Sequence, residues 1–151
     1  MLKTLRIDED TCCMLLPQLR KYVGSNASSQ DSILLSCLNT AIIEVQDRSG
    51  RSVAPCEMRL EASCISDTVV PLYGDVAQVT SVRTPAGQDV AFASRGNAVD
   101  TLGAIHEDLV IDYTTAPDDG EKQRLIPVVL QYAAALFDGQ TDEIHKILAQ
   151  C

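Results

Sequence analysis

The period of the hydrophobic positions changes twice along this chain and divides it into three stretches. From about residue 11 to residue 50, apolar side chains recur every three or four positions, as on an amphipathic helix. From about 55 to 114 they occur in short runs between turn residues, which is typical of strands. Helical spacing returns at about 121 and continues to residue 151. This order predicts an α+β fold with segregated elements.

The longest periodic segment, Ser28 to Gly50, is expected to be the helix on which the others pack. Its apolar stripe consists of Leu34, Cys37, Leu38, Ala41, Ile42 and Val45. Ser28, followed by Asp31, approximates a capping box at the start of the helix. Arg48 places a cation at the carbonyl end of the helix dipole. Gly50 suits the left-handed position that closes a helix.

Further helices are predicted before and after this one. The segment from Thr11 to Val23 places Cys12, Leu15, Leu16, Leu19, Tyr22 and Val23 on one face. The segment after residue 121 does the same with Leu125, Val128, Val129, Tyr132, Leu136 and Phe137. Pro17 and Pro127 conflict with these helices, because proline lacks the N–H group, so each should kink its helix or lie in a first turn. A last short helix is expected from Asp142 to Gln150.

The middle stretch predicts about four to six short antiparallel strands joined by tight turns. The runs are residues 56–65, 69–73, 76–82, 89–93 and 109–113. Val76 and Val82 should share one face of their strand, with Val79 on the other. Ser94 to Asp100 is predicted as a loop. The expected architecture is one domain, residues 1–151: a small helical domain of two N-terminal helices and one or two C-terminal helices, with an inserted antiparallel strand block.

Composition and charge narrow the possible environments and partners. A chain of 151 residues with 46% hydrophobic content can bury a sizeable core, but aromatic residues are only 4%. The net charge of −9 disfavours tight wrapping by nucleic acid. The six cysteines are expected to be free thiols, because no signal peptide precedes a chain of this size. No run of apolar residues suggests a membrane span, so the chain is expected to work in a reducing cytosol.

No pattern typical of catalysis or cofactor binding occurs in the sequence. A zinc site would require His106 or His145 to meet distant cysteines, because no CxxC or HxxxH spacing is present. The acidic pairs 118–119 and 142–143 are expected in a loop and at a helix N-terminus, which are ordinary places for such residues, rather than as general acid and base. The glycines form no phosphate-binding loop. The sequence therefore predicts no catalytic, cofactor-binding or metal-binding residue, no cofactor, and no enzymatic activity.

One run within the strand block resembles a known family. Residues 71–82, PLYGDVAQVTSV, are similar to the strand–turn–strand segment of phage head–tail connector proteins, the adaptor or head-completion proteins of tailed phages. Segments 49–51, 109–114 and 133–138 resemble, in the family's order, the end of its long helix, its last strand and its alanine-rich helix. The resemblance covers roughly residues 15 to 140. Asp75 departs from it, because proline is common at that position.

The resemblance implies a structural protein of the virion neck, assembled in the host cytoplasm. Such proteins form a ring of about twelve copies beneath the portal of the capsid, extend the DNA channel and carry the stopper or tail. DNA passes through the lumen without sequence-specific binding, and no membrane is involved. In the family the C-terminal segment often grips the portal, which makes Ile144, Ile147 and Leu148 the expected portal contacts. The alternative is that this tail packs on its own domain.

Three other functions agree with the same residues. The chain could be the head-closure, or stopper, protein of the same connector. It could be a small cytosolic binding module that offers a strand edge to a peptide. It could also be an enzyme whose site assembles from distant cysteine and histidine residues, which would give a cleft with a perturbed cysteine.

Overall fold

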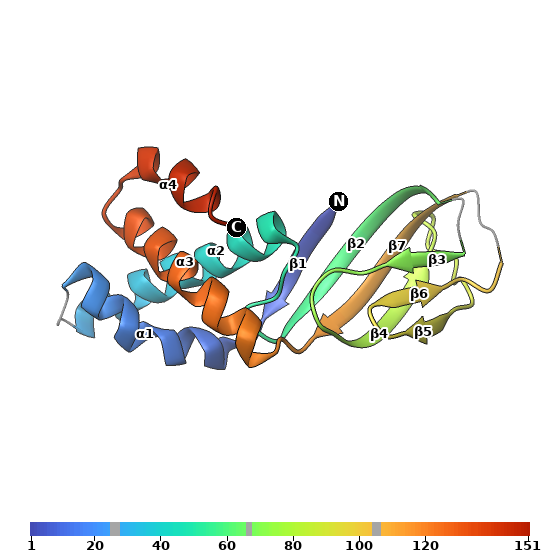
Figure 1. The fold of residues 1–151 in the computed structure, drawn as a ribbon, viewed down its shortest axis with the longest axis horizontal. Coiled ribbons are helices and arrows are strands. Elements are labelled where there is room, and N and C mark those ends of the chain that lie inside the picture. Colours follow the sequence, from blue (N-terminus) through green and yellow to red (C-terminus); the bar gives the residue numbers. More distant parts are fainter. Residues whose placement is uncertain (25–27, 66–67, 104–106) are drawn as a thin grey trace.

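Helices and strands lie at opposite ends of an elongated molecule (Figure 1). The structure is a computed structural model and describes residues 1–24, 28–65, 68–103 and 107–151. Within these residues, α1, α2, α3 and α4 form a helical lobe, and two antiparallel sheets form a β lobe. The predicted α+β class is confirmed. In the described residues, no helix is both long and apolar enough to span a bilayer.

Helix α1 (Glu9–Val23) begins at Asp8, whose carboxylate accepts the Asp10 N–H at 3.1 Å. It ends at Gly24, which adopts the left-handed conformation with φ 69°. Pro17 neither ends nor starts the helix but lies inside it, on the exposed side. The carbonyl that loses its i+4 partner belongs to Cys13, which is also exposed, so solvent can satisfy that carbonyl.

Helix α2 (Asp31–Ser49) follows a short 3₁₀ segment, η1 (Ser28–Gln30). The predicted capping box is therefore wrong: Gln30 occupies the N-cap position, and no side chain caps the helix. The Asp31 carboxylate instead pairs with Arg20 of α1, with the Arg20 Nε atom 3.1 Å from Oδ1. The C-terminal prediction is confirmed, because Gly50 has φ 66° and its N–H donates to the Gln46 carbonyl at 2.9 Å.

Helices α3 (Asp119–Phe137) and α4 (Thr141–Leu148) complete the helical lobe. Helix α3 starts earlier than its apolar spacing suggests, because Asp118 caps it by accepting the Glu121 N–H at 2.8 Å. Pro127 consequently lies in the middle of α3, again on the exposed side of the helix. α1 packs on both α2 and α3, and α4 packs on the other side of α3 (Figure 1).

The larger sheet has four antiparallel strands in the order β1-β2-β7-β4. Their bounds are β1 (Leu2–Ile7), β2 (Cys56–Ile65), β4 (Val76–Arg83) and β7 (Glu107–Thr115). The N-terminal strand thus joins a block that the sequence placed at about 55–114. The predicted separation of Val79 from Val82 is wrong, because irregularities at 76–78 and 79–81 turn both side chains into the core.

A smaller sheet of three strands has the order β3-β6-β5. Its strands are β3 (Val69–Pro71), β5 (Ala93–Arg95) and β6 (Ala98–Asp100). The predicted loop from Ser94 to Asp100 is therefore most of a hairpin that turns at 96–97. Of the predicted strand at 89–93, only Asp89 and Val90 pair with β4, through Arg83 and Val82.

Each lobe has an apolar centre in one continuous core. Fully buried side chains in the helical lobe include Leu19, Leu34, Leu38, Ile42, Val45 and Leu125. In the β lobe they include Met58, Val99, Leu109, Ile111 and Tyr113. The Tyr113 hydroxyl donates to the Tyr73 carbonyl at 3.0 Å and accepts from the Tyr73 N–H at 3.3 Å. Burial raises the pKa of Tyr113 to about 12, so this hydroxyl stays protonated and fixes the loop after β3.

Candidate functional site

The predicted portal contacts lie together on one face of α4. Ile147 is buried, and Ile144 and Leu148 are half-buried against the helical core. At the end of α4 the Gln150 side chain donates to the Gln131 amide oxygen of α3 at 3.1 Å. The opposite face carries Asp142, Glu143, His145 and Lys146. In the isolated chain the three apolar residues thus pack on their own lobe, and their contact with a portal stays a prediction.

A buried polar side chain, Gln46, joins the two lobes. Its amide oxygen accepts the N–H groups of Val53 at 2.8 Å and Ala54 at 3.1 Å, in the segment that leads from α2 to β2. Its Nε2 atom donates to the Thr4 hydroxyl of β1 at 3.2 Å. Asp47 accepts from the Thr4 N–H and hydroxyl, both at 2.8 Å. The end of α2 therefore holds the edge of the larger sheet and the connecting segment in one arrangement.

Sequence reasoning missed Gln46, although a signal was present. Gln46 follows Ile42 by four positions and therefore falls on the apolar stripe of α2. A polar residue at a core position requires buried partners. Those partners lie in β1 and in the segment after α2, and their identity depends on the fold rather than on local spacing.

Cys56 lies in a second buried polar cluster beside Gln46. Its Sγ atom is 3.0 Å from the Thr115 hydroxyl, which is 2.7 Å from the Ser52 hydroxyl. Burial raises the pKa of the Cys56 thiol, although the hydrogen bonds from Thr115, Ser52 and Gln46 oppose this. A protonated, buried thiol is a poor nucleophile. The geometry of Cys56 therefore suits packing at the lobe junction.

The remaining candidates for chemistry are spread over the molecule. His145 is exposed on α4, whereas His106 lies outside the described residues. Within residues 1–24, 28–65, 68–103 and 107–151, no group of three or more histidine, cysteine or acidic side chains could hold a metal ion. The free thiols there are Cys12, Cys13, Cys37, Cys56 and Cys151. The Cys64 side chain also lies outside the described part.

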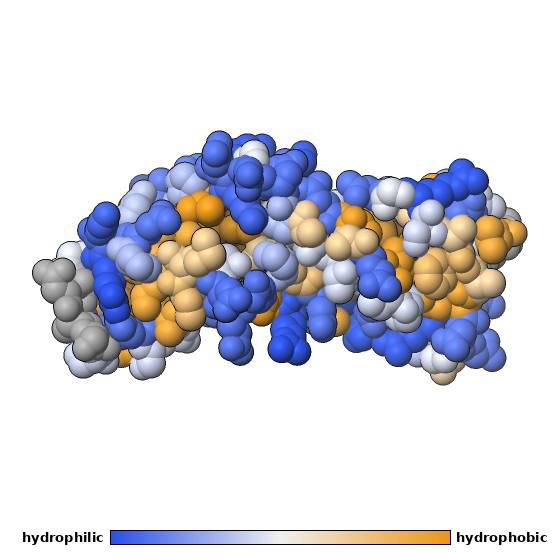
Figure 2. Space-filling view, turned by 90° about the horizontal axis from the view of Figure 1, so that it is seen from below, coloured by the Kyte–Doolittle hydropathy of each residue, from blue (hydrophilic) through white to orange (hydrophobic). Residues whose placement is uncertain are grey.

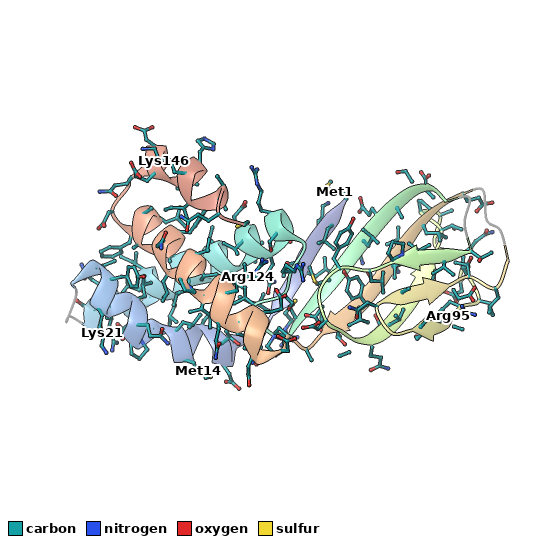
Figure 3. The ribbon with its side chains drawn as sticks, in the orientation of Figure 1. Met1, Met14, Lys21, Arg95, Arg124 and Lys146 are labelled. Carbon is teal, nitrogen blue, oxygen red and sulfur yellow. The ribbon has the colours of Figure 1, made fainter. Side chains whose placement is uncertain are left out.

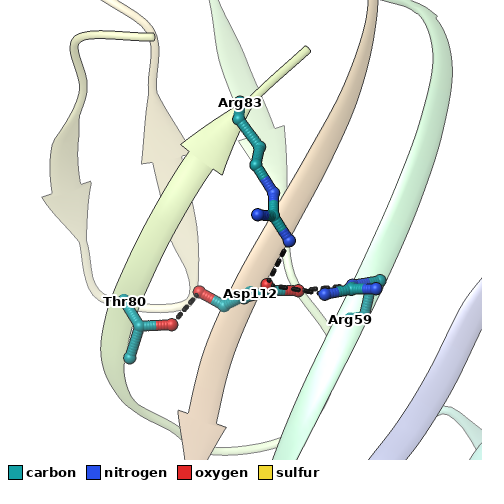
Figure 4. Close-up of polar contacts among 4 residues, drawn as sticks. All are labelled: Arg59, Thr80, Arg83 and Asp112. Carbon is teal, nitrogen blue, oxygen red and sulfur yellow. Dashed lines mark hydrogen bonds and ion pairs between the residues drawn. The ribbon is translucent and has the colours of Figure 1, made fainter. Parts of the chain in front are cut away.

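Two arginines share one aspartate on the outer face of the larger sheet (Figure 4). Arg59 of β2 binds Asp112 of β7 through two hydrogen bonds of 2.7 and 3.0 Å, and Arg83 of β4 adds one of 3.1 Å. The hydrogen bonds and charge from Arg59, with the charge of Arg83, lower the pKa of Asp112, although partial burial opposes this. The network connects three of the four strands of the larger sheet through polar contacts.

We predict a pH-dependent loss of stability from Asp112→Asn. A carboxyl group with a lowered pKa in the folded state stabilises the fold above its unfolded pKa, and this contribution is lost as pH falls through the folded pKa. At pH 7 the variant should lose about 1 to 2 kcal/mol of unfolding free energy. The difference from wild type should shrink as the pH falls below about 4. Urea unfolding at several pH values measures this, and an unchanged difference at low pH would contradict it.

The helices that flank the strand block in the sequence, α1 and α2 before it and α3 and α4 after it, come together in one helical lobe, as predicted from the sequence. No protein-family model matches the sequence, and no curated protein matches it.

Solved structures share the fold over most of the chain. One is described as "Neck of empty GTA particle computed with C6 symmetry", with 22% identity, a TM-score of 0.59, and coverage of 91% of this chain and 84% of the matched chain. Another is "Neck of native GTA particle computed with C12 symmetry", with 20% identity, a TM-score of 0.58, and coverage of 91% and 83%. A third, "Virion of native gene transfer agent (GTA) particle", matches at 20% identity and a TM-score of 0.59, with coverage of 91% and 84%. The expected resemblance to connector proteins is thus confirmed at the level of the fold.

Proposed function

We propose that this protein is a structural component of a phage-like neck, where it forms a ring that joins the capsid portal to the tail or stopper. The observation that carries the proposal is a fold shared over 91% of the chain with chains of gene transfer agent particles, one of them in a neck computed with C12 symmetry. A ring of about twelve copies then extends the DNA channel. The role requires no catalytic residue.

The charge of the chain agrees with a conduit for DNA. A net charge of −9 disfavours retention of a phosphate backbone, so DNA can slide past the ring without sequence-specific binding. Several basic residues are also held in ion pairs, among them Arg59 and Arg83, which pair with Asp112. The proposed partners are therefore further copies of the chain, the portal and the next neck protein.

Mixing the purified chain with its cognate portal and imaging the product by electron microscopy tests this function. A rotationally symmetric collar on the narrow end of the portal is the expected result. Bare portals at chain concentrations well above micromolar would overturn the adaptor role. Binding of the chain to a finished adaptor ring, but not to the portal alone, would assign it to head closure instead.

The apolar face of α4 should matter for attachment to the portal. Ile144→Asp combined with Leu148→Asp is expected to weaken portal binding at least tenfold, because each buried aliphatic side chain contributes about 1.5 to 3 kcal/mol. Sedimentation with portal particles measures the loss. Asp142→Ala with Lys146→Ala, on the opposite face of α4, is the matched control. If the tail serves only its own lobe, the double aspartate variant will melt earlier yet bind the portal like wild type.

A further inference from the structure

The exposed side of α1 forms a ridge on the surface of the helical lobe. Asp10, Cys13, Met14, Pro17 and Lys21 share this side, and we call them the α1 ridge. Met14 is 75% exposed, which is unusual for a large apolar side chain. Seen from the α1 side, apolar side chains gather over the helical end of the molecule (Figure 2). Such a surface favours contact with another protein.

A groove continues the ridge toward α2. It has a volume of about 380 Å³ and is lined largely by the apolar groups of Ile7, Cys12, Cys13 and Leu35. Acidic side chains lie at the edge of this groove, because Asp8, Glu9 and Asp10 are at the start of α1. The ridge and the groove together form an apolar surface with a negative end near the sheets.

The opposite side of the helical lobe carries positive charge, also near the end of the lobe that faces the sheets. Arg48 in the last turn of α2 and Arg124 near the start of α3 are both exposed. Within the described residues no ion pair involves either side chain. Cys151 lies beside them: burial raises the pKa of its thiol, and the charges of Arg48 and Arg124 oppose the rise.

The two surfaces lie on opposite sides of the α2–α3 pair and near the same end of the lobe. α1 and α4 flank this pair, with Met14 on the α1 side and Lys146 on the α4 side (Figures 1 and 3). α1 starts directly after β1, α2 ends before β2 and α3 starts after β7. Asp10, Arg48 and Arg124 therefore all lie at the ends of their helices that face the sheets.

We infer that the α1 ridge of one copy docks against the Arg48–Arg124 surface of the next copy, head to tail. The inference rests on the proposed ring and names the faces that build it. Opposite charges at the same distance from the sheets bring neighbours together with their long axes side by side, and the uncharged members of the ridge, Cys13, Met14 and Pro17, are removed from water. A contact between two different faces continues from copy to copy and closes when the rotation allows a ring.

Native thiols on the two surfaces allow a direct test. Cys13 lies on the ridge and Cys151 beside the two arginines, and both are exposed. A short bismaleimide should join Cys13 of one copy to Cys151 of the next and give a ladder of covalent oligomers from assembled rings. Either Cys13→Ser or Cys151→Ser alone should abolish the ladder. Dimers that persist in either variant would show that the same surface of two copies meets, which would overturn the inference.

Charge reversal tests the electrostatic part of the contact. Asp10→Lys and Arg124→Glu should each raise the concentration needed for ring assembly at least tenfold, because like charges then face each other. The two changes together should restore assembly. Asp89→Lys, the same reversal at an exposed site on the β lobe, should assemble like wild type.

Failure of the proposed interface and failure of the proposed neck function give different results. If rings form on the portal while both single reversals assemble normally, the interface is wrong and the neck function stands. If the wild-type chain yields no ring, no collar and no ladder, then both the interface and the proposed function fail.

Discussion

Replacing Gln46 with leucine is expected to lower the free energy of unfolding by about 3 kcal/mol. Leucine is close to glutamine in size, so little cavity is created. The change instead leaves the N–H groups of Val53 and Ala54 without their acceptor in a region closed to water. Each buried donor without a partner costs about 1 to 3 kcal/mol, and the added apolar burial offsets part of this.

Urea unfolding measures the effect, and α3 provides a matched control. Gln123→Leu is the same substitution at an exposed helical position, where a change within about 0.5 kcal/mol is expected. A loss from Gln46→Leu no greater than that of the control would show that the amide does not hold the lobes together. The variant should also leave the transition cooperative, because the core side chains on both sides are retained.

Gly50→Ala is expected to cost about 2 to 3 kcal/mol, which combines two effects. Gly50 has φ 66°, a conformation that costs an alanine about 1 kcal/mol or more. A Cβ atom there would also lie 2.9 Å from the Cδ1 atom of Tyr73, so the ring must move. The Tyr73 backbone is held by the Tyr113 hydroxyl, which limits how far the loop can yield.

Gly24 separates these two effects. It ends α1 with φ 69°, but a Cβ atom at this position meets nothing within 4 Å. Gly24→Ala should therefore show only the conformational cost, about 1 kcal/mol. Thermal or urea unfolding of both variants gives the difference. Equal losses would mean that the contact between Gly50 and Tyr73 has no energetic weight.

Long periodic elements were predictable from the sequence because their signals are local. The stripe of α2 repeats over about three turns, from Leu34 to Val45, and Gly50 closes the helix as expected. In α3 the predicted face is buried from Leu125 to Tyr132. The helix starts differ from the prediction for two reasons: Asp31 pairs with Arg20 of the neighbouring α1, and Asp118 caps α3 well before its first predicted apolar residue, Leu125.

The β lobe was less predictable because its pairing is not local. Irregular register in β4 turns both Val79 and Val82 inward, which simple alternation cannot anticipate. β5 and β6 are three residues each and carry one fully buried side chain, Val99, too weak a signal for a hairpin. β1 joins the larger sheet through partners that lie 49 to 58 positions away, from Ile7↔Cys56 to Leu2↔Leu60.

The candidate site was likewise predictable only where its signal is local in the sequence. The spacing of Ile144, Ile147 and Leu148 correctly predicts one apolar face on α4. What that face contacts depends on partners, so the sequence left both alternatives open. The junction built around Gln46 and Cys56 was missed, because its members come from four separate segments of the chain.

The helical lobe is made from two helices before the strand block and two after it, and this order affects how the protein folds during synthesis. Between the end of α2 and the start of α3 lie residues 50–118. At ribosomal rates of roughly 5 to 20 residues per second, this stretch takes about 4 to 14 seconds to emerge. During that interval α1 and β1 have been made, but α3, which also packs on α2, has not. The nascent chain therefore exposes for seconds a surface that chaperones bind, and the lobe becomes stable only when α3 leaves the ribosome.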